Sequence, residues 1–305
     1  MQHIVSIGEC MIEMARREDG AFDANVGGDT FNTAIYLARL GAPVSYMTAV
    51  GDDPYSTMIM DAAHAEGVGC DTIQVVEGRM PGLYLIETHS GERSFWYWRD
   101  TAPARDLFEL DGAANLAATM AAAGTVYLSG ITLSLYSAHG LDQLEDALIQ
   151  ARQAGAKIVI DSNYRPTGWQ RNIERARRIY ARFWSHTDIA LPSFDDEQAL
   201  WGDIEPAETM ARLEKFGVGE ICLKMADQGA IVHTDGTAQH VPPDAVLDPI
   251  DTTAAGDSFS AAYLWARLNG HPPARAAAHG HRLAAIVIQH PGAIAPADAT
   301  ANFKI

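Results

Sequence analysis

The regular alternation of short apolar, β-branched runs with longer helical patterns most constrains how this chain of 305 residues can fold. The runs predicted as strands are 3–8, 43–50, 125–129, 157–161, 188–191, 220–224 and 229–233. The stretches predicted as helices are 30–40, 54–66, 139–154, 171–183 and 207–215. This alternation predicts an α/β fold with a mostly parallel central sheet and helices on both faces. Because ligands in such folds bind beyond the carboxyl ends of the strands, we expect functional residues to follow strands.

One stretch departs from the alternation. Residues 83–88 and 93–98 are rich in aromatic and β-branched residues, and they flank His89-Ser90-Gly91-Glu92, which predicts a β-hairpin. Aromatic residues occupy both faces of its second strand, so we expect both faces to be covered. We interpret the hairpin as a lid that closes over a ligand and also pairs with another subunit. An ordinary edge hairpin is the alternative interpretation.

The charge balance excludes several kinds of partner. The chain has 22 Lys and Arg residues against 39 Asp and Glu residues, a net charge of −17. Such a balance repels phosphate backbones and anionic lipid headgroups, which argues against nucleic-acid and membrane partners. An anionic small-molecule substrate would therefore need basic residues placed locally in its site.

The cysteines and the N-terminal residues predict a cytoplasmic protein. Cys10, Cys70 and Cys222 are widely spaced and odd in number, which is typical of free thiols in a reducing compartment. The first residues lack the basic region and long apolar stretch of a signal peptide. No apolar run approaches the roughly 20 residues of a membrane span.

The run Asp251-Thr252-Thr253-Ala254-Ala255-Gly256-Asp257 joins turn residues to a helical pattern. A helix N-terminus offers unpaired backbone N–H groups and a partial positive charge, and small residues let a phosphate approach them closely. Asp257 falls in the first turn, beside such a phosphate, where it can accept a proton from an attacking hydroxyl. From the spacing alone, a simple helix-capping role for Asp257 is an equal alternative.

The same run, continued by Ser258 and Phe259, resembles the C-terminal signature of the ribokinase (PfkB) carbohydrate kinases. Most members have glycine where this chain has Ala254, and we expect alanine to be tolerated because only its backbone N–H is needed. The resemblance implies that Asp257 is the catalytic base and that Ala254, Ala255 and Gly256 form an anion hole with it. It also implies a single ribokinase-like kinase domain over residues 1–305, with a β lid built from about 9–24 and 81–100.

A second motif appears in the order that this family has. Gly27-Gly28-Asp29-Thr30-Phe31-Asn32 leads into the first predicted helix, and paired glycines allow close approach of a ligand to the backbone. In the family this element binds sugar hydroxyls, which implies that Gly28, Asp29 and Asn32 contact the sugar. A glycine pair alone is better explained by a turn; the later motif makes the sugar-binding interpretation the stronger one.

Within the family, the chain is most similar to the 2-keto-3-deoxygluconate kinases. The matching stretches are 8–9, 28–32, 51–54, 82–84, 97–99, 129–132, 161–166 and 192–197. This resemblance implies that Tyr84, Tyr97, Arg99 and Arg165 are further sugar contacts. A sugar acid bears a carboxylate, which a planar guanidinium can hold through two hydrogen bonds. Without the resemblance, solvated surface arginines would be the simpler interpretation of Arg99 and Arg165.

The nucleotide side follows from the same resemblance. Residues 224–230 join two predicted strands, and in the family this strand-turn-strand element lies against the nucleotide. It contains Lys224 and Gly229, and Ala226 stands where the family has its first glycine. Asn163 and Arg165 are implied to lie near the transferred phosphate. The helical stretch 273–289 should form one wall of the adenine site, where the small residues Ala277, Gly280 and Ala284 leave room.

The resemblance also implies metal ions. The family has an Asn-x-x-Glu element that organises Mg²⁺ through water, and Ser193 and Asp196 stand in its place here. A water-rich magnesium site tolerates this exchange because any carboxylate can hold a hydrated ion. Asp251 and Thr253 resemble the ligands of an activating monovalent cation, K⁺, in ribokinases.

The predicted function is therefore ATP-dependent phosphorylation of 2-keto-3-deoxygluconate to the 6-phosphate, with a homo-oligomer formed through the lid. One alternative keeps the chemistry and changes the substrate to fructose or another hexose. Another is a non-catalytic sugar- or nucleotide-sensing protein on the same fold, which the Gly256-Asp257 pair argues against. A dinucleotide-dependent redox enzyme is disfavoured because no Gly-x-Gly-x-x-Gly follows the first strand.

Overall fold

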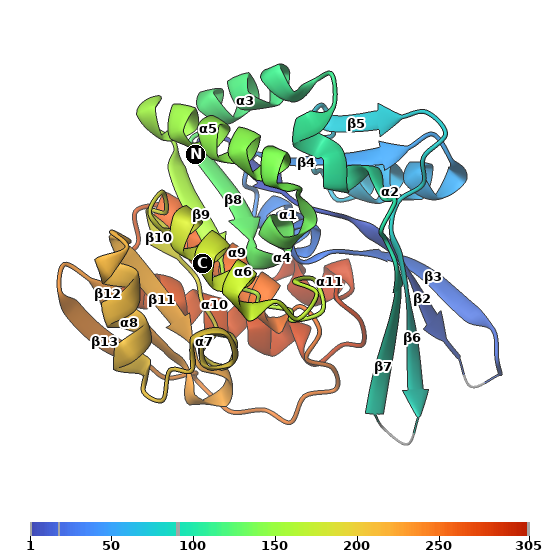
Figure 1. Ribbon diagram of the computed structural model, residues 1–305. Helices are drawn as coiled ribbons and strands as arrows, with labels where there is room; N and C mark the ends of the chain where they lie inside the picture. The colour runs from blue at the N-terminus through green and yellow to red at the C-terminus, as the bar shows by residue number, and fades with distance from the viewer. Residues whose placement is uncertain (1, 18, 90–91, 304–305) are drawn as a thin grey trace.

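The computed structural model describes residues 2–17, 19–89 and 92–303. Its body is a nine-stranded sheet (Figure 1) in which β12 pairs antiparallel with both of its neighbours and the other pairings are parallel. Its strands, in spatial order, are β13 (Thr237–Val241), β12 (Ala230–Thr234), β11 (Glu220–Lys224), β10 (Ile189–Ala190), β9 (Lys157–Asp161), β8 (Thr125–Ser129), β1 (Ile4–Ile7), β4 (Val44–Gly51) and β5 (Ile73–Val76). The mostly parallel sheet that the alternation predicts is confirmed.

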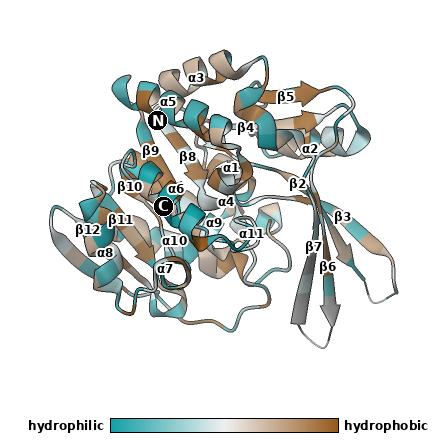
Figure 2. Cartoon of the chain, viewed as in Figure 1, coloured by the Kyte–Doolittle hydropathy of each residue, from teal (hydrophilic) through white to brown (hydrophobic). Residues whose placement is uncertain are grey.

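Successive residues of the central strands pack into two different hydrophobic cores. On β9, Val159 joins one core, whereas Ile158 and Ile160 join the other. This alternation follows from the two-residue period of a strand, and it explains why the interior residues of these strands are apolar on both faces. Figure 2 shows the resulting concentration of hydrophobic residues in the central strands.

The helices divide between the two faces. One core includes residues of α1 (Asp29–Arg39), α2 (Pro54–Ala65), α9 (Ala255–Leu268) and α10 (Pro273–Val287), with α11 (Ala297–Ala301) beside α1 and α10. The other includes residues of η1 (Pro103–Glu109), α3 (Ala113–Ala122), α4 (Gly130–Leu135), α5 (Ala138–Gln153), α6 (Ile173–Trp184), α7 (Phe194–Trp201) and α8 (Pro206–Lys215). Within the described ranges, no helix has the length and apolar character needed to cross a bilayer.

A four-stranded second sheet projects from this body (Figure 1). Its order is β3 (Phe22–Gly27), β2 (Met11–Arg16), β6 (Leu83–His89) and β7 (Glu92–Trp98). The central pair is parallel and the outer pairs are antiparallel. The hairpin of β6 and β7 agrees with the prediction, although its turn at Ser90 and Gly91 lies outside the described residues.

One face of the small sheet is open to solvent within a single chain. Trp96 and Trp98 are 55% and 61% exposed, so the face of β7 that carries them is not covered within one chain. The side chains of Met14, Phe22, Leu83, Leu85 and Trp98 line an apolar groove there. The sequence pattern shows that this strand is apolar on both sides, and coverage of its second side by another subunit stays a prediction.

Candidate active site

A cavity of about 460 Å³ opens at the carboxyl edge of the large sheet, where the small sheet meets it. That volume suits a small polar ligand. Most of the predicted site residues line it, namely Gly28, Asp29, Asn32, Tyr84, Tyr97, Asn163, Arg165, Asp196, Lys224, Thr253, Ala254, Ala255, Gly256 and Asp257. Arg99, Gly229 and Asp251 do not line it. The parallel sheet therefore brings together motifs from both ends of the chain, as the position of ligand sites in such sheets predicts.

Asp257 lies in the first turn of α9, where it is half-buried and lines the cavity. Asn32 Nδ2 donates a hydrogen bond to Asp257 Oδ2 at 2.8 Å, and Thr33 Oγ1 donates to its backbone carbonyl at 3.3 Å. Burial and the nearby charge of Asp29 raise the pKa of Asp257 to about 8, against the opposing effect of the Asn32 hydrogen bond. Asp257 is thus a carboxyl group that can exchange a proton close to neutral pH.

The N-terminus of α9 supplies fewer free N–H groups than the resemblance implies. The Ala255 N–H donates to Thr252 O at 3.2 Å within the turn. The N–H groups of Gly256 and Asp257 have no acceptor in the part of the chain that the structure describes. A Cβ on Gly256 would approach Lys224 Nζ to only 3.5 Å, an ordinary contact, so the glycine leaves open space beside these two N–H groups. Two donors and a helix dipole therefore face the cavity.

Ala254 caps α9 in a left-handed conformation, with φ 58° and ψ 17°. This conformation explains why glycine is common at the position, because a Cβ there meets the backbone. Ala226, the other alanine in place of a family glycine, is also left-handed, with φ 48°. The expectation that Ala254 needs only its N–H is therefore incomplete, since its backbone conformation also matters.

Replacing Ala254 with Gly should raise the free energy of unfolding by about 0.5 kcal/mol, because relief of left-handed strain outweighs the extra entropy of the unfolded chain. The matched control is Ala255→Gly, one residue further along, where the backbone is helical and glycine should lower stability. Urea unfolding of both variants measures the difference. The same sign for both would contradict this account of Ala254.

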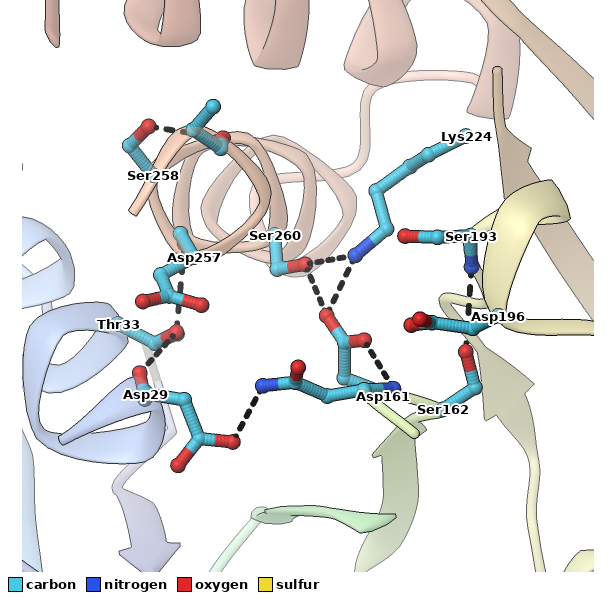
Figure 3. Close-up of polar contacts among 12 residues, drawn as sticks. Asp29, Thr33, Asp161, Ser162, Ser193, Asp196, Lys224, Asp257, Ser258 and Ser260 are labelled. Carbon is cyan, nitrogen blue, oxygen red and sulfur yellow. Dashed lines mark hydrogen bonds and ion pairs between the residues drawn. The ribbon is translucent and has the colours of Figure 1, made fainter. Parts of the chain in front are cut away.

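Lys224 ends β11 and is buried rather than a surface lysine. Its Nζ donates to Asp161 Oδ2 at 2.6 Å and to Ser260 Oγ at 3.3 Å, and Ser260 also donates to Asp161 at 2.9 Å (Figure 3). Asp161 ends β9 and lines the cavity, although it was not among the predicted site residues. Its place at the carboxyl end of a central strand was the signal that could have found it.

Asn163 connects two acidic residues instead of reaching freely into the cavity. Its Nδ2 donates to Asp29 Oδ2 at 2.7 Å, and its backbone N–H donates to Asp161 Oδ1 at 3.2 Å (Figure 3). Its φ of 31° lies outside the usual range for a residue other than glycine. Burial and the charge of Asp161 raise the pKa of Asp29, and hydrogen bonds such as that from Asn163 oppose the shift. The Asn163 side chain is thus part of the support for the cavity wall.

Arg165 and Asp196 form an ion pair at the cavity, with 3.0 Å between Nη1 and Oδ1. The same Nη1 donates to Tyr164 O at 2.9 Å, and the Tyr164 N–H donates to Asp196 Oδ2 at 3.2 Å. Burial raises the pKa of Asp196, and the Arg165 charge offsets part of that shift. The neighbouring Glu197 lies in the interior, 3.1 Å from Arg212, so of these two acids Asp196 is the one at the cavity.

The two predicted tyrosines face the same cavity from the small sheet. Tyr84 and Tyr97 are direct partners across β6 and β7, and their ring centroids are 5.9 Å apart. The Tyr84 hydroxyl donates to Glu13 Oε2 on β2 at 2.5 Å. Arg99, by contrast, pairs with the buried carboxylate of Glu9 and is absent from the cavity lining. The structure does not place Arg99 where its predicted sugar contact requires, because a closer buried acid binds the guanidinium.

A second cavity of about 230 Å³ adjoins the first and shares Ser193, Lys224, Ala255 and Gly256 with it. Gly229 lines this second cavity, with φ 97°, and a Cβ there would lie 2.4 Å from Val241 O. Its other lining residues include Phe194, Ala226, Phe259, His281 and Ala284. Of the three small residues expected to leave room on α10, Ala277 and Gly280 are instead buried in packing contacts, Gly280 against the Phe259 ring.

Asp251 and Thr253 are engaged with their own loop. Asp251 Oδ1 accepts hydrogen bonds from the Thr253 N–H at 2.9 Å and from Thr253 Oγ1 at 2.7 Å, and Oδ2 accepts from the Gly292 N–H at 2.8 Å. Over the described ranges, no cluster of three or more His, Cys, Asp or Glu side chains is arranged to hold a metal ion.

The chain is similar to known proteins over nearly its whole length. Residues 1–300 match the model of the family described as pfkB family carbohydrate kinase. The 2-dehydro-3-deoxygluconokinase of Dickeya dadantii is 41% identical over 307 residues, which covers 98% of both chains. That of Escherichia coli is 42% identical over 97% of this chain and 98% of its own. Among solved structures, a putative ribokinase II from E. coli in complex with ATP and Mg²⁺ has a TM-score of 0.83 at 23% identity, over 96% of this chain and 94% of its own.

Proposed function

The chain belongs to the pfkB family of carbohydrate kinases, and from this premise we propose that it transfers the γ-phosphoryl group of ATP to the 6-hydroxyl of 2-keto-3-deoxygluconate. This sugar acid is another name for the 2-dehydro-3-deoxygluconate in the names of the relatives. The observation that carries the proposal is the position of Asp257. Its carboxyl group, two N–H groups of the α9 N-terminus and the cations Arg165 and Lys224 face one cavity.

The sugar occupies the larger cavity and the nucleotide the adjoining one. Asn32 supports this placement because its Oδ1 is buried without a hydrogen-bond partner in the described residues, so a sugar hydroxyl can satisfy it. Gly28 is required nearby because a Cβ would lie 2.3 Å from Glu9 O. We assign the substrate carboxylate to Arg165, whose guanidinium lines the cavity and can exchange its contact with Asp196 for one with the substrate.

Magnesium fits this site as an ion carried with ATP. Asp29, Asp161 and Asp196 present carboxylates to the cavity, yet within the described ranges they form no direct metal cluster, which suits the water-rich coordination of Mg²⁺. When bound, the ion would neutralise charge on the phosphates. We assign no step to a monovalent cation, because hydrogen bonds within the loop already occupy the Asp251 carboxylate.

In the proposed reaction, Asp257 accepts the proton of the 6-hydroxyl as that oxygen bonds to the γ-phosphorus of ATP. The bond from the γ-phosphorus to the bridging oxygen breaks, and ADP leaves with the electron pair. The N–H groups of Gly256 and Asp257 stabilise the charge on the transferred group. Lys224 lies where the two cavities meet, so it adds positive charge there while Asp161 holds its ammonium in place.

We further propose that the chain is one kinase domain in which the small sheet acts as a lid. Tyr84 and Tyr97 reach the cavity from that sheet, so its closure would exclude water as a competing acceptor. Its opposite face exposes Phe22, Trp96 and Trp98, and we propose a second copy of the chain as the partner that covers it. The three free cysteines support a cytoplasmic setting.

The kcat/KM for the sugar should rise with pH from about 6 and level off above about 8 to 9. The pKa of Asp257 is raised to about 8, so its carboxyl group is mostly protonated below that pH. A protonated carboxyl group cannot act as a base. Asn32→Leu removes the hydrogen bond that favours the anion and should move the midpoint upward. The measurement is a pH–rate profile of both proteins with saturating ATP. A flat profile from pH 6 to 9 would contradict the role of Asp257.

A coupled assay of ADP formation across sugar acids and hexoses tests the proposed function. We expect the highest kcat/KM with 2-keto-3-deoxygluconate or its C4 epimer. A preference for fructose would support the hexose-kinase alternative and overturn the assigned substrate. Failure to turn over ATP with any sugar, together with retained sugar binding, would favour the non-catalytic sensor.

A further inference from the structure

Glu13 occupies a position in the small sheet that the proposed reaction does not yet explain. It lies on β2 directly opposite Tyr84 of β6, and the residue is only 7% exposed. Glu13 Oε2 accepts the hydrogen bond of the Tyr84 hydroxyl at 2.5 Å. A buried carboxylate is costly unless it is paired. The pairing with a tyrosine that lines the cavity therefore suggests a role in that cavity.

The backbone of Gly27 holds the Tyr84 hydroxyl on another side. A Cβ on Gly27 would lie 2.6 Å from the Tyr84 oxygen, closer than nonbonded atoms approach each other, and 3.9 Å from Glu13 Oε2. Tyr97 packs against the Tyr84 ring on β7. The hydroxyl thus lies between a carboxylate and a close backbone segment, and it has little freedom to turn.

This arrangement decides which kind of group Tyr84 can bind. A tyrosine hydroxyl has one proton to donate, and Glu13 accepts it, so only lone pairs are available to a ligand. Burial, together with the negative charge of Glu13, raises the pKa of Tyr84, so the hydroxyl keeps its proton over the physiological range. Tyr84 consequently suits a donor, such as a sugar hydroxyl, and does not suit a carboxylate.

We propose that Glu13 is a positioning residue that holds Tyr84 as a hydrogen-bond acceptor for a hydroxyl of the sugar, and that this leaves the sugar carboxylate to Arg165. The proposal rests on the proposed function in assuming a substrate with both groups. It adds a second determinant of substrate orientation. Arg165 selects the acidic end, and the Glu13–Tyr84 pair selects a hydroxyl of the carbon chain.

A double-mutant cycle tests this pair. Glu13→Leu removes the acceptor, so the Tyr84 proton can turn toward the ligand. We expect the KM for the sugar to rise about 5- to 10-fold, the loss of one well-placed hydrogen bond, with kcat within about 2-fold. Glu13→Gln keeps an oxygen acceptor at the same place, so its KM should stay within about 3-fold of that of the wild type. In a Tyr84→Phe background, Glu13→Leu should add less than about 2-fold, because the hydroxyl that it positions is gone.

Gly27→Ala provides an independent perturbation should Glu13→Leu fold poorly, as judged by thermal unfolding. The added methyl group must displace the Tyr84 hydroxyl while Glu13 stays, so the KM should rise with kcat nearly unchanged. An unchanged KM in both Glu13→Leu and Gly27→Ala would overturn the proposal. So would an equal rise in KM caused by Glu13→Leu with and without the Tyr84 hydroxyl, because that result indicates a general structural role.

The experiment separates this inference from the proposed function. Wild-type turnover with 2-keto-3-deoxygluconate reports on the assigned substrate alone. The cycle is then measured with whichever sugar of the panel the wild type phosphorylates fastest. Every one of these sugars has hydroxyls that Tyr84 can accept from, so the cycle tests the role of Glu13 even if the assigned sugar acid is wrong.

Discussion

Asp257→Asn should lower kcat about 1,000-fold or more while ATP affinity changes by less than about 3-fold. Asparagine keeps the shape of the side chain and can still contact Asn32, but it cannot accept the hydroxyl proton, and general-base catalysis contributes roughly 100- to 10,000-fold. Steady-state kinetics and nucleotide titration by calorimetry measure the two quantities. A kcat within about 10-fold of that of the wild type would remove Asp257 from the role of base.

The same substitution should also raise stability. The pKa of Asp257 is raised by folding, so its ionisation opposes the folded state; this cost is absent below about pH 4 and grows as pH rises toward 8. The asparagine side chain of the variant cannot ionise, so we expect a higher Tm for the variant at pH 8 and a smaller difference at pH 5. Asp298→Asn is a matched control, because Asp298 is an exposed acid in the first turn of α11. It should change neither kcat nor Tm appreciably.

Arg165→Ala should reduce kcat/KM for 2-keto-3-deoxygluconate about 100-fold and that for a neutral hexose by less than about 5-fold. A charge-assisted hydrogen bond contributes roughly 1.5–3 kcal/mol, and about 1.4 kcal/mol corresponds to a factor of ten. Removal of the guanidinium also leaves Asp196 without its 3.0 Å partner, which adds repulsion toward an anionic substrate. Kinetics with an acidic and a neutral sugar measure the ratio of the two losses.

Two further variants make the result specific. Arg165→Lys keeps the charge but loses the planar two-donor geometry, so it should recover part of the selectivity. Arg178→Ala removes an exposed arginine on α6 and should leave both sugars unaffected. Equal losses for the acidic and the neutral sugar in Arg165→Ala would assign Arg165 to the phosphate instead of the substrate carboxylate.

The fold could be predicted well because its signals are local. Runs such as 125–129 and 157–161 match β8 and β9 residue for residue, since a strand covered on both faces is apolar throughout. The weaker elements were either missed or predicted with inexact bounds for the same reason. In α3 only Leu116 and Met120 are buried among many alanines, so the helical period is faint. The strand β10 has two residues, too short to define its own bounds.

The site was predictable where one motif contains both the residue and its surroundings. Asp257 and the glycine pair at Gly27 and Gly28 belong to such motifs, and the structure brings Asp257, Gly28 and Asn32 to one cavity. Arg99 was predicted at the cavity, but the buried Glu9 on a different segment holds it. The two side chains lie far apart in sequence, so no local pattern reveals that competition.

The sequence by itself determined the parallel sheet, because hydrophobic periodicity acts over a few residues, and the order of its two motifs carried the resemblance that points to the family. Only the tertiary structure decided that Lys224 is buried against Asp161, that Ala254 is left-handed, and that Glu13 accepts the hydrogen bond of the Tyr84 hydroxyl. Each of these depends on which groups meet when distant segments pack and on the charges that packing removes from water. Those quantities, which set protonation and hydrogen-bond direction, exist only once the chain has folded.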